Sequence, residues 1–372
     1  SEVNLSAQTE GLEITGGAAV DKITGGEGAD TIKSGDGNDE ITVAAAGKAN
    51  SDTMDGEAGS GDVLKLSTGA HTFGDDDKLK NIEKVETHSS GSEVNLSAQT
   101  EGLEITGGAG NDIITGGKAI DTIKAGDGTD TITGGAGNDI ITGGAGVDTF
   151  KVDKDTDTIK DLGGASGGES DILIVSKDAK AEATVSVSFT ATSSTVNNVA
   201  NDVTKAIIST DTDGATINLK DATGVYTLKG GDGVDKLTGS AGADTIKSGD
   251  GNDEITVGSA GHGNSDTMDG EAGSGDVLKL STGAHTFGDD DKLKNIEKVE
   301  THSSGSEVNL SAQTEGLEIT GGAAVDKITG GEGADTIKSG DGNDEITVAA
   351  AGKANSDTMD GEAGSGDVLK LS

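Results

Sequence analysis

The chain has 372 residues and a formal charge of −40; 63 residues are glycine, and proline, cysteine, tryptophan and arginine are absent. Aromatic side chains make up 1% of the sequence, so no conventional aromatic core can form, and there is no disulfide to replace it. Composition alone is typical of an acidic, disordered linker. The charge argues against nucleic acid and anionic membranes as partners and favours bound cations. No apolar run approaches the roughly 20 residues of a membrane span.

Long repeats divide the sequence into modules. The segment SEVNLSAQTEGLEITGGA begins at Ser1, Ser92 and Ser306, and residues 306–372 repeat residues 1–67 letter for letter. This spacing predicts a short module at 1–91, a long module at 92–305 and a partial copy of the short module at 306–372. The long module has the same two ends as the short one, with extra residues between them.

A second repeat, of nine residues, argues against disorder. An aliphatic or aromatic side chain recurs at every ninth position in four ladders: Leu5, Ile14, Ile23, Ile32 and Ile41; Leu96, Ile105, Ile114, Ile123, Ile132, Ile141, Phe150 and Ile159; Leu219, Leu228, Leu237, Ile246 and Ile255; Leu310, Ile319, Ile328, Ile337 and Ile346. Nine is neither a helical period nor simple strand alternation. It fits two short strands and two turns per coil of 18 residues, with coils stacked in parallel. The sequence therefore predicts an all-β parallel β-roll or β-helix solenoid, with Ile114 over Ile132 and Ile123 over Ile141.

Within the ladders the repeat reads Gly-Gly-x-Gly-x-Asp-x-apolar-x. Five units fill residues 107–151, and three units fill each of 16–42, 230–256 and 321–347. This pattern resembles the RTX (repeats-in-toxin) proteins of bacteria, and the NIE and VNLSA segments resemble those of bacterial surface-layer and related RTX surface proteins. The resemblance implies a calcium-binding β-roll that is exported unfolded by type I secretion and folds in the calcium outside the cell.

The residue types of the repeat suit calcium. Glycine lets the backbone turn tightly and approach an ion, and Ca²⁺ takes about six to eight oxygens from carboxylates and carbonyls. One turn cannot supply that set, but two turns stacked 18 residues apart can. The predicted carboxylate ligands are Asp21, Asp30, Asp39, Asp112, Asp121, Asp130, Asp139, Asp148, Asp157, Asp235, Asp244, Asp253, Asp326, Asp335 and Asp344. The predicted carbonyl ligands belong to Gly26, Gly28, Gly35, Gly37, Gly108, Gly110, Gly126, Gly128, Gly135, Gly137, Gly144, Gly146, Gly231, Gly233, Gly249, Gly251, Gly331, Gly333, Gly340 and Gly342.

Stacking also predicts which aspartates meet. The expected pairs are Asp112 with Asp130, Asp121 with Asp139, Asp130 with Asp148, Asp21 with Asp39, Asp235 with Asp253, and Asp326 with Asp344. Asp157 is expected to close one further site although its turn has lost its glycines. Elsewhere the next ninth positions are Lys48 and His262, so the register is expected to end there. Alanine replaces the fourth-place glycine at Ala19, Ala119 and Ala324, which predicts strained or weak sites.

The remaining segments complete the long module, in which we expect a β-roll at 92–151, a β-rich insertion at 152–228, and a β-roll with a connector at 229–305. In the insertion, residues 183–192 and 214–231 alternate as strands, while residues 197–210 fit either a short helix or a strand. The connector DDDKLKNIEKVET, at 75–87 and again at 289–301, is expected to lead the chain into the next module's ladder.

Enzyme signatures do not support a catalytic role. The metalloprotease motif H-E-x-x-H is absent, and Ser166 in GASGG matches G-x-S-x-G only as expected by chance in a glycine-rich segment. We therefore expect a secreted, calcium-dependent structural protein that assembles with copies of itself, and with other surface components, as a surface layer, extracellular filament or matrix. No nucleic acid or membrane span is expected. Two alternatives stay open: the stalk of a giant RTX adhesin, and the calcium-binding region of an RTX toxin or enzyme whose catalytic domain lies outside this chain.

Overall fold

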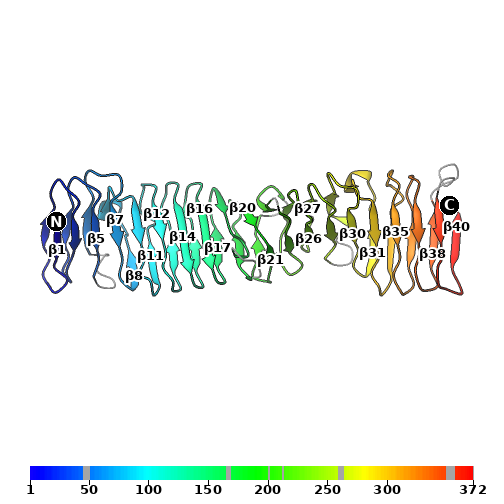
Figure 1. Ribbon diagram of the computed structural model, residues 1–372, viewed down its shortest axis with the longest axis horizontal. Helices are drawn as coiled ribbons and strands as arrows, with labels where there is room; N and C mark the ends of the chain where they lie inside the picture. The colour runs from blue at the N-terminus through cyan, green and yellow to red at the C-terminus, as the bar shows by residue number, and fades with distance from the viewer. Residues whose placement is uncertain are drawn as a thin grey trace. The chain divides into compact units, whose positions relative to one another are not determined.

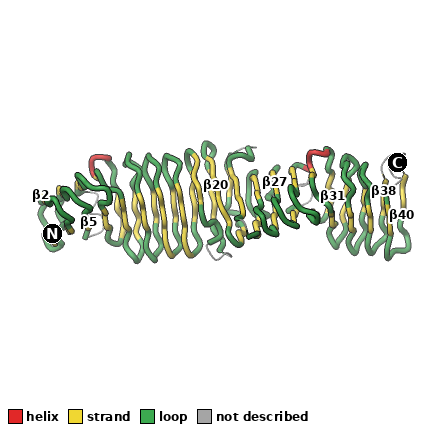
Figure 2. The backbone as a smooth tube through the Cα atoms, turned by 45° about the horizontal axis from the view of Figure 1, so that its top comes forward, coloured by secondary structure: helices red, strands yellow, loops and turns green. Residues whose placement is uncertain are grey.

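Short parallel strands separated by glycine-rich turns form nearly all of the protein. The computed structural model describes residues 1–44, 51–164, 169–199, 202–211, 213–258, 264–348 and 357–371. These residues form two compact units, one reaching Ala183 and the other starting at Thr184. The strands of each unit are labelled in Figure 1, where the colour runs from blue at the N-terminus to red at the C-terminus. Figure 2 shows how regularly strand and turn alternate within each unit.

In unit 1, most successive strands lie on opposite faces of the coil. The first face is one parallel sheet of β1 (Glu2–Asn4), β3 (Lys22–Thr24), β5 (Glu40–Thr42), β7 (Val63–Lys65), β10 (Lys84–Glu86), β12 (Glu104–Thr106), β14 (Thr122–Asp127), β16 (Ile140–Ala145), β18 (Thr156–Ile159) and β20 (Lys180–Val185). The opposite face begins with β2 (Glu13–Thr15), β4 (Thr31–Lys33), β6 (Thr53–Asp55) and β9 (Leu79–Lys80). It continues with β8 (Gly69–Thr72), β11 (Ser92–Asn95), β13 (Ile113–Thr115), β15 (Thr131–Thr133), β17 (Thr149–Val152) and β19 (Ile172–Val175).

Unit 2 repeats this construction. One sheet contains β23 (Ala206–Thr210), β25 (Thr227–Lys229), β27 (Thr245–Lys247), β29 (Thr267–Asp269) and β32 (Leu293–Lys294). A second contains β21 (Ser188–Thr190), β24 (Thr216–Asn218), β26 (Lys236–Thr238), β28 (Glu254–Thr256), β30 (Val277–Lys279), β33 (Lys298–Glu300), β35 (Glu318–Thr320), β37 (Thr336–Lys338) and β39 (Thr358–Asp360). A third contains β31 (Gly283–Thr286), β34 (Ser306–Asn309), β36 (Lys327–Thr329), β38 (Glu345–Val348) and β40 (Val368–Leu371). The short β22 (Val196–Asn197) bridges to Thr223.

The nine-residue ladders form the core. Ile114 pairs in register with Ile132, and Ile123 with Ile141, as the sequence predicts. All four side chains are fully buried, whereas the residues on either side of each face outward because side chains alternate across a strand. One apolar side chain per nonapeptide is therefore enough to fill the thin interior, and the all-β solenoid prediction is confirmed.

The segment 152–228 forms more coils of the same kind. In unit 1, Ile159 of β18 pairs with Ala183 of β20, and in unit 2, Phe189 of β21 pairs with Ile217 of β24. The segment at 197–210, for which the sequence pattern left helix and strand open, contains strand β23. The β-rich insertion is thus built from parallel strands that stack on their neighbours.

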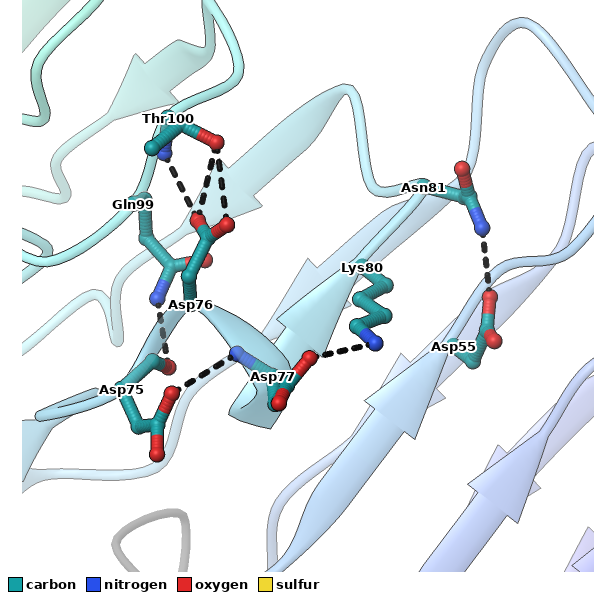
Figure 3. A network of polar contacts seen from close by, with 8 residues as sticks. All are labelled: Asp55, Asp75, Asp76, Asp77, Lys80, Asn81, Gln99 and Thr100. Carbon is teal, nitrogen blue, oxygen red and sulfur yellow. Dashed lines mark hydrogen bonds and ion pairs between the residues drawn. The ribbon is translucent and has the colours of Figure 1, made fainter.

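Each connector contains a single turn of 3-10 helix, η1 (Asp76–Lys78) in unit 1 and η3 (Asp290–Lys292) in unit 2, drawn in red in Figure 2. Asp75 caps η1 by accepting a hydrogen bond from Asp77 N. The amide of Gln99, in the next module, donates to Asp75 O (3.1 Å), and Thr100 binds the Asp76 carboxylate (Figure 3). After η1 the chain forms β9 and then β10, which pairs with β12, so the connector leads into the next ladder as predicted.

Adjacent isoleucines of β13 provide a matched test of the core. Ile114 is fully buried, whereas Ile113 is 48% exposed. With calcium saturating, Ile114→Ala is expected to destabilise the protein by about 2–5 kcal/mol through a cavity. Ile113→Ala is expected to change stability by no more than about 0.5 kcal/mol. Urea unfolding followed by far-UV circular dichroism measures both; equal effects would contradict the assignment of the inner face.

Candidate metal centre

The motif aspartates stack in buried columns. All fifteen aspartates predicted as ligands are at most 3% exposed. The backbone N–H of each donates to the carboxylate one coil later where a further motif aspartate follows: Asp112 N to Asp130 Oδ1 (2.7 Å), Asp121 to Asp139 (2.8 Å), Asp130 to Asp148 (2.9 Å), Asp139 to Asp157 (3.1 Å), and Asp21 to Asp39, Asp235 to Asp253 and Asp326 to Asp344 (2.8 Å each). Every pair expected from the sequence is therefore brought together, and Asp157 joins its column.

The second carboxylate oxygen behaves in two ways. In the first coil of a tract it closes its own turn, as where Asp121 Oδ2 accepts from Gly117 N (2.6 Å). In the coils that follow it is buried and has no hydrogen-bond partner among the described residues: this holds for Oδ2 of Asp39, Asp130, Asp139, Asp157, Asp253 and Asp344. A buried carboxylate oxygen without a partner is costly, so these atoms indicate where a positively charged ligand belongs.

Glycines in these later turns hold the backbones close together. Gly144 and Gly146 have φ of +110° and +124°, which favours glycine. A Cβ on Gly144 would lie 1.8 Å from Gly126 O, and one on Gly146 would lie 1.6 Å from Gly128 O. The predicted carbonyls of Gly126 and Gly128 thus face the next turn. Other predicted carbonyls, including those of Gly108 and Gly231, each accept a backbone hydrogen bond from the coil above.

The alanines at the fourth place of the motif are not strained. Ala19, Ala119 and Ala324 do not have positive φ. They lie in the first coil of their tracts, where the fourth-place glycine, such as Gly110 or Gly233, does not have positive φ either. The prediction of strain at these alanines is therefore wrong, because the left-handed turn is confined to later coils. At the end of the long tract, Asp155 takes the fourth place with φ of 51°, and its carboxylate accepts from Gly137 N (3.1 Å).

Burial makes the columns electrostatically unfavourable. Removal from water raises the pKa of Asp139 to about 6, of Asp148 to about 7 and of Asp157 to about 8. Neighbouring carboxylates contribute to these raised pKa values, as those of Asp139, Asp153 and Asp155 do for Asp157. A cation bound between the turns would reverse this effect, because an opposite charge favours the ionised carboxyl.

The columns extend beyond the nonapeptide motif, which sequence reasoning missed. Additional pairs join Asp30 N to Asp52 Oδ1 (2.9 Å), Asp39 to Asp62 (2.7 Å), Asp148 to Asp171 (2.8 Å), Asp244 to Asp266 (3.0 Å), Asp253 to Asp276 (2.8 Å), Asp335 to Asp357 (3.1 Å) and Asp344 to Asp367 (3.0 Å). Their spacing is 22 or 23 residues, so a count of nine does not reach them. The usable signal is Asp-x-apolar, as in Asp62-Val63-Leu64.

The nine-residue register ends before Lys48 and His262, as expected, because the next column aspartates follow after 22 or 23 residues instead of 18. Both residues lie outside the described part of the chain, as does Ser166. The columns of Asp30 and Asp244 nevertheless continue, at Asp52 and Asp266, so the longer spacing does not break them.

The donor set fits an oxygen-loving cation. In the residues that the structure describes, no three His, Cys, Asp or Glu side chains gather closely enough to hold a metal by themselves. An ion between turns must therefore use backbone carbonyls as well as carboxylates. Such an all-oxygen set suits calcium, whereas transition metals favour nitrogen and sulfur ligands.

Comparison with known families agrees with this chemistry. Residues 14–44, 104–123, 115–150, 125–159, 227–259 and 319–349 match the family model described as RTX calcium-binding nonapeptide repeat (4 copies). The chain is an RTX calcium-binding repeat protein. Its cofactor is Ca²⁺, and its β-roll is a calcium-binding structural element. Proteins with these RTX repeats are typically exported by type I secretion. No curated protein matches the chain.

A separate structural finding concerns membranes. None of the helices in the described parts of this RTX protein is long and apolar enough to cross a bilayer.

Acid is expected to lower the calcium concentration that folding requires. Because the pKa values of Asp148 and Asp157 are raised from 3.8, the calcium-free folded form binds more protons than the unfolded form. Its stability should therefore rise as the pH falls from about 8 to about 4 and should be lost as the pH rises through these pKa values. The unfolded carboxyls stay ionised between about pH 8 and pH 6, so protons stabilise only the folded form, and the calcium concentration at half-folding should decrease as the pH falls over this range. Circular dichroism titrations at each pH measure it; a constant midpoint would contradict the prediction.

Proposed function

We propose that this chain is a secreted structural repeat protein that folds on binding calcium and assembles with copies of itself at the cell surface. The observation that carries the calcium step is the set of buried carboxylate oxygens without partners, repeated from Asp39 to Asp344. The proposed ligands are the stacked aspartate pairs together with carbonyls of the second and fourth turn glycines. Calcium supplies the divalent charge and the demand for several oxygens that such turns can meet together.

Folding is expected to depend on this charge. Ordering the backbone costs roughly 1–2 kcal/mol per residue, and glycine loses the most conformational freedom. Against this, each nonapeptide buries one apolar side chain, such as Ile132, and brings one more carboxylate into the column. Because carboxylates such as Asp130 and Asp139, whose Oδ2 atoms have no hydrogen-bond partner among the described residues, oppose stacking, the binding free energy of calcium becomes folding free energy.

Calcium should therefore induce sheet structure, whereas magnesium should not replace it. Magnesium needs near-octahedral geometry and keeps its water, which flexible turns of carbonyls do not suit. A far-UV circular dichroism titration of the whole chain with each metal, at matched ionic strength, tests this. Retention of full sheet content and thermal midpoint after exhaustive chelation would exclude calcium-dependent folding.

The assembly step is supported by exposed aliphatic side chains at the corners. Val20, Val234 and Val325 occupy the fifth place of equivalent turns and are 58%, 63% and 58% exposed. Ile120 holds the same place in another tract and is also exposed. Repetition at matching positions gives many weak contacts that act together, which suits lateral association between identical arrays. The near-identity of the modules supports a scaffold, and we infer no catalytic role.

Polar substitution at these corners should weaken assembly without changing the fold. The triple variant Val20→Ser, Val234→Ser, Val325→Ser removes the apolar contacts, and the matched control Lys22→Ser, Lys236→Ser, Lys327→Ser changes exposed residues two places along. Sedimentation velocity and electron microscopy in calcium measure assembly, and circular dichroism measures folding. Calcium-folded protein that stays monomeric at high concentration would contradict self-assembly and favour the adhesin stalk.

A further inference from the structure

A turn without the nonapeptide motif stacks directly on a motif turn. Its sequence, DGEAGSGD at 55–62, lies after the family match that ends at residue 44. Asp36 and Ala58 form a parallel bridge, and Gly37 N donates to Ala58 O (2.8 Å). Glu57 has φ of 58°, matching the left-handed Gly35 of the motif turn below, with φ of 98°. The backbone at 56–59 therefore follows the path of a calcium-motif turn despite its different sequence.

The carboxylates of these two turns are stacked and incompletely satisfied. Asp39 N donates to Asp62 Oδ1 (2.7 Å), and both side chains are 1% exposed. The Oδ2 atoms of Asp39 and Asp62 are buried without a hydrogen-bond partner among the described residues. This is the same pattern as at Asp130 and Asp139 in the motif tract.

Three oxygens converge beside Gly59. A Cβ built on this residue would lie 2.1 Å from Gly37 O, 2.5 Å from Asp62 Oδ2 and 2.9 Å from Asp62 Oδ1. That point is too close to Gly59 Cα for an ion. The convergence nevertheless shows that a carbonyl of the lower turn and a carboxylate of the upper turn are directed into one space, which only glycine leaves open.

The arrangement recurs in unit 2. Asp253 N donates to Asp276 Oδ1 (2.8 Å), and the Oδ2 atoms of both aspartates are again buried without partners among the described residues. A Cβ on Gly273 would lie 2.2 Å from Gly251 O and 2.5 Å from Asp276 Oδ2. Because the same geometry occurs in two modules, it is not peculiar to one loop.

We propose that these degenerate turns complete further calcium sites, one between the turns at 34–39 and 56–62 and one between those at 248–253 and 270–276. The ligands are the carboxylates of Asp39 and Asp62, or Asp253 and Asp276, with carbonyls of the stacked turns. This inference rests on the calcium-dependent scaffold proposed above and extends it to residues that the repeat motif does not contain.

Such a site would link the nonapeptide repeats at 16–42 to the connector at 75–87. The upper surface of the 56–62 turn contacts residues 80–81, where Gly56 N donates to Lys80 O (2.9 Å). Asn81 Nδ2 binds Asp55 Oδ1 (2.7 Å) at the turn's first residue (Figure 3). Asp62 N donates to Glu83 Oε2 (2.8 Å), so a connector glutamate terminates the carboxylate column. An ion held at Asp62 would therefore lie beside the segment through which the chain enters the next module.

The test removes the charge of the upper aspartates and keeps their shape. In the full chain, the double variant Asp62→Asn, Asp276→Asn is expected to bind about two fewer calcium ions, one per copy, in equilibrium dialysis at saturating calcium. The amide oxygen of each asparagine can still accept the hydrogen bond from Asp39 or Asp253. The matched control Asp36→Asn, Asp250→Asn makes the same charge change at exposed residues of the stacked turns and should bind as many ions as the unaltered protein.

A motif variant separates the two levels of the proposal. If Asp139→Asn loses calcium while Asp62→Asn, Asp276→Asn binds the full number, the degenerate-turn sites are refuted and the scaffold stands. If neither variant loses calcium, the scaffold proposal fails as well. Should the double variant fail to fold, anomalous scattering from calcium in crystals of the unaltered chain decides. Peaks beside Gly59 and Gly273 would support the sites, and peaks between motif turns alone would overturn them.

Discussion

The hydrogen bond from the backbone N–H of one buried aspartate to the carboxylate of the next is the interaction on which both units depend. It fixes the distance between coils, aligns the strands so that Ile114 meets Ile132, and places each carboxylate above another. The same bond therefore creates order and an electrostatic problem, because stacked carboxylates such as Asp130 and Asp139 lose water and lie close to other carboxylates. The lysine pairs lie instead on the outer strand faces, as where Lys65 meets Glu40 and Glu86. Such exposed pairs contribute little to stability, so they cannot balance the buried columns.

The hydrogen-bonded aspartate columns explain why a chain with the composition of a disordered linker has a defined fold. Its interior is one side chain wide and grows only by adding coils, so each coil depends on its neighbours for burial. Glycine at Gly144 and Gly146 allows the turns to approach, at the cost of a highly flexible unfolded chain. A fold that is completed by an external ion is stable where the ion is abundant and loose where it is scarce.

Periodicity predicted the fold and the central pairs because nine-residue spacing leaves one register in which both the isoleucines and the aspartates stack. Where spacing changes, the prediction failed. Asp52, Asp62 and Asp171 belong to the same columns, but corner insertions hide them from a count of nine. Strand β23 could not be distinguished from a helix because its burial depends on neighbouring coils that are distant in sequence. The alanines at Ala19 and Ala119 were misjudged because turn conformation depends on position within the tract, which one nonapeptide does not encode.

These differences separate what the modules must keep from what they can vary. The neighbouring coils on both sides constrain two positions: the inward-facing residue of the strand and the aspartate two residues before it. The Asp-x-apolar pattern therefore recurs from Asp21 onward, within the nonapeptide repeats and after them. The turns between strands are less constrained. The spacing between column aspartates can therefore grow while the column continues, as from Asp148 to Asp171. Surface chemistry can therefore diverge from module to module with the ion-binding interior unchanged. An array of this design gains length by repeating coils and gains new contacts at its corners, and neither change requires the other.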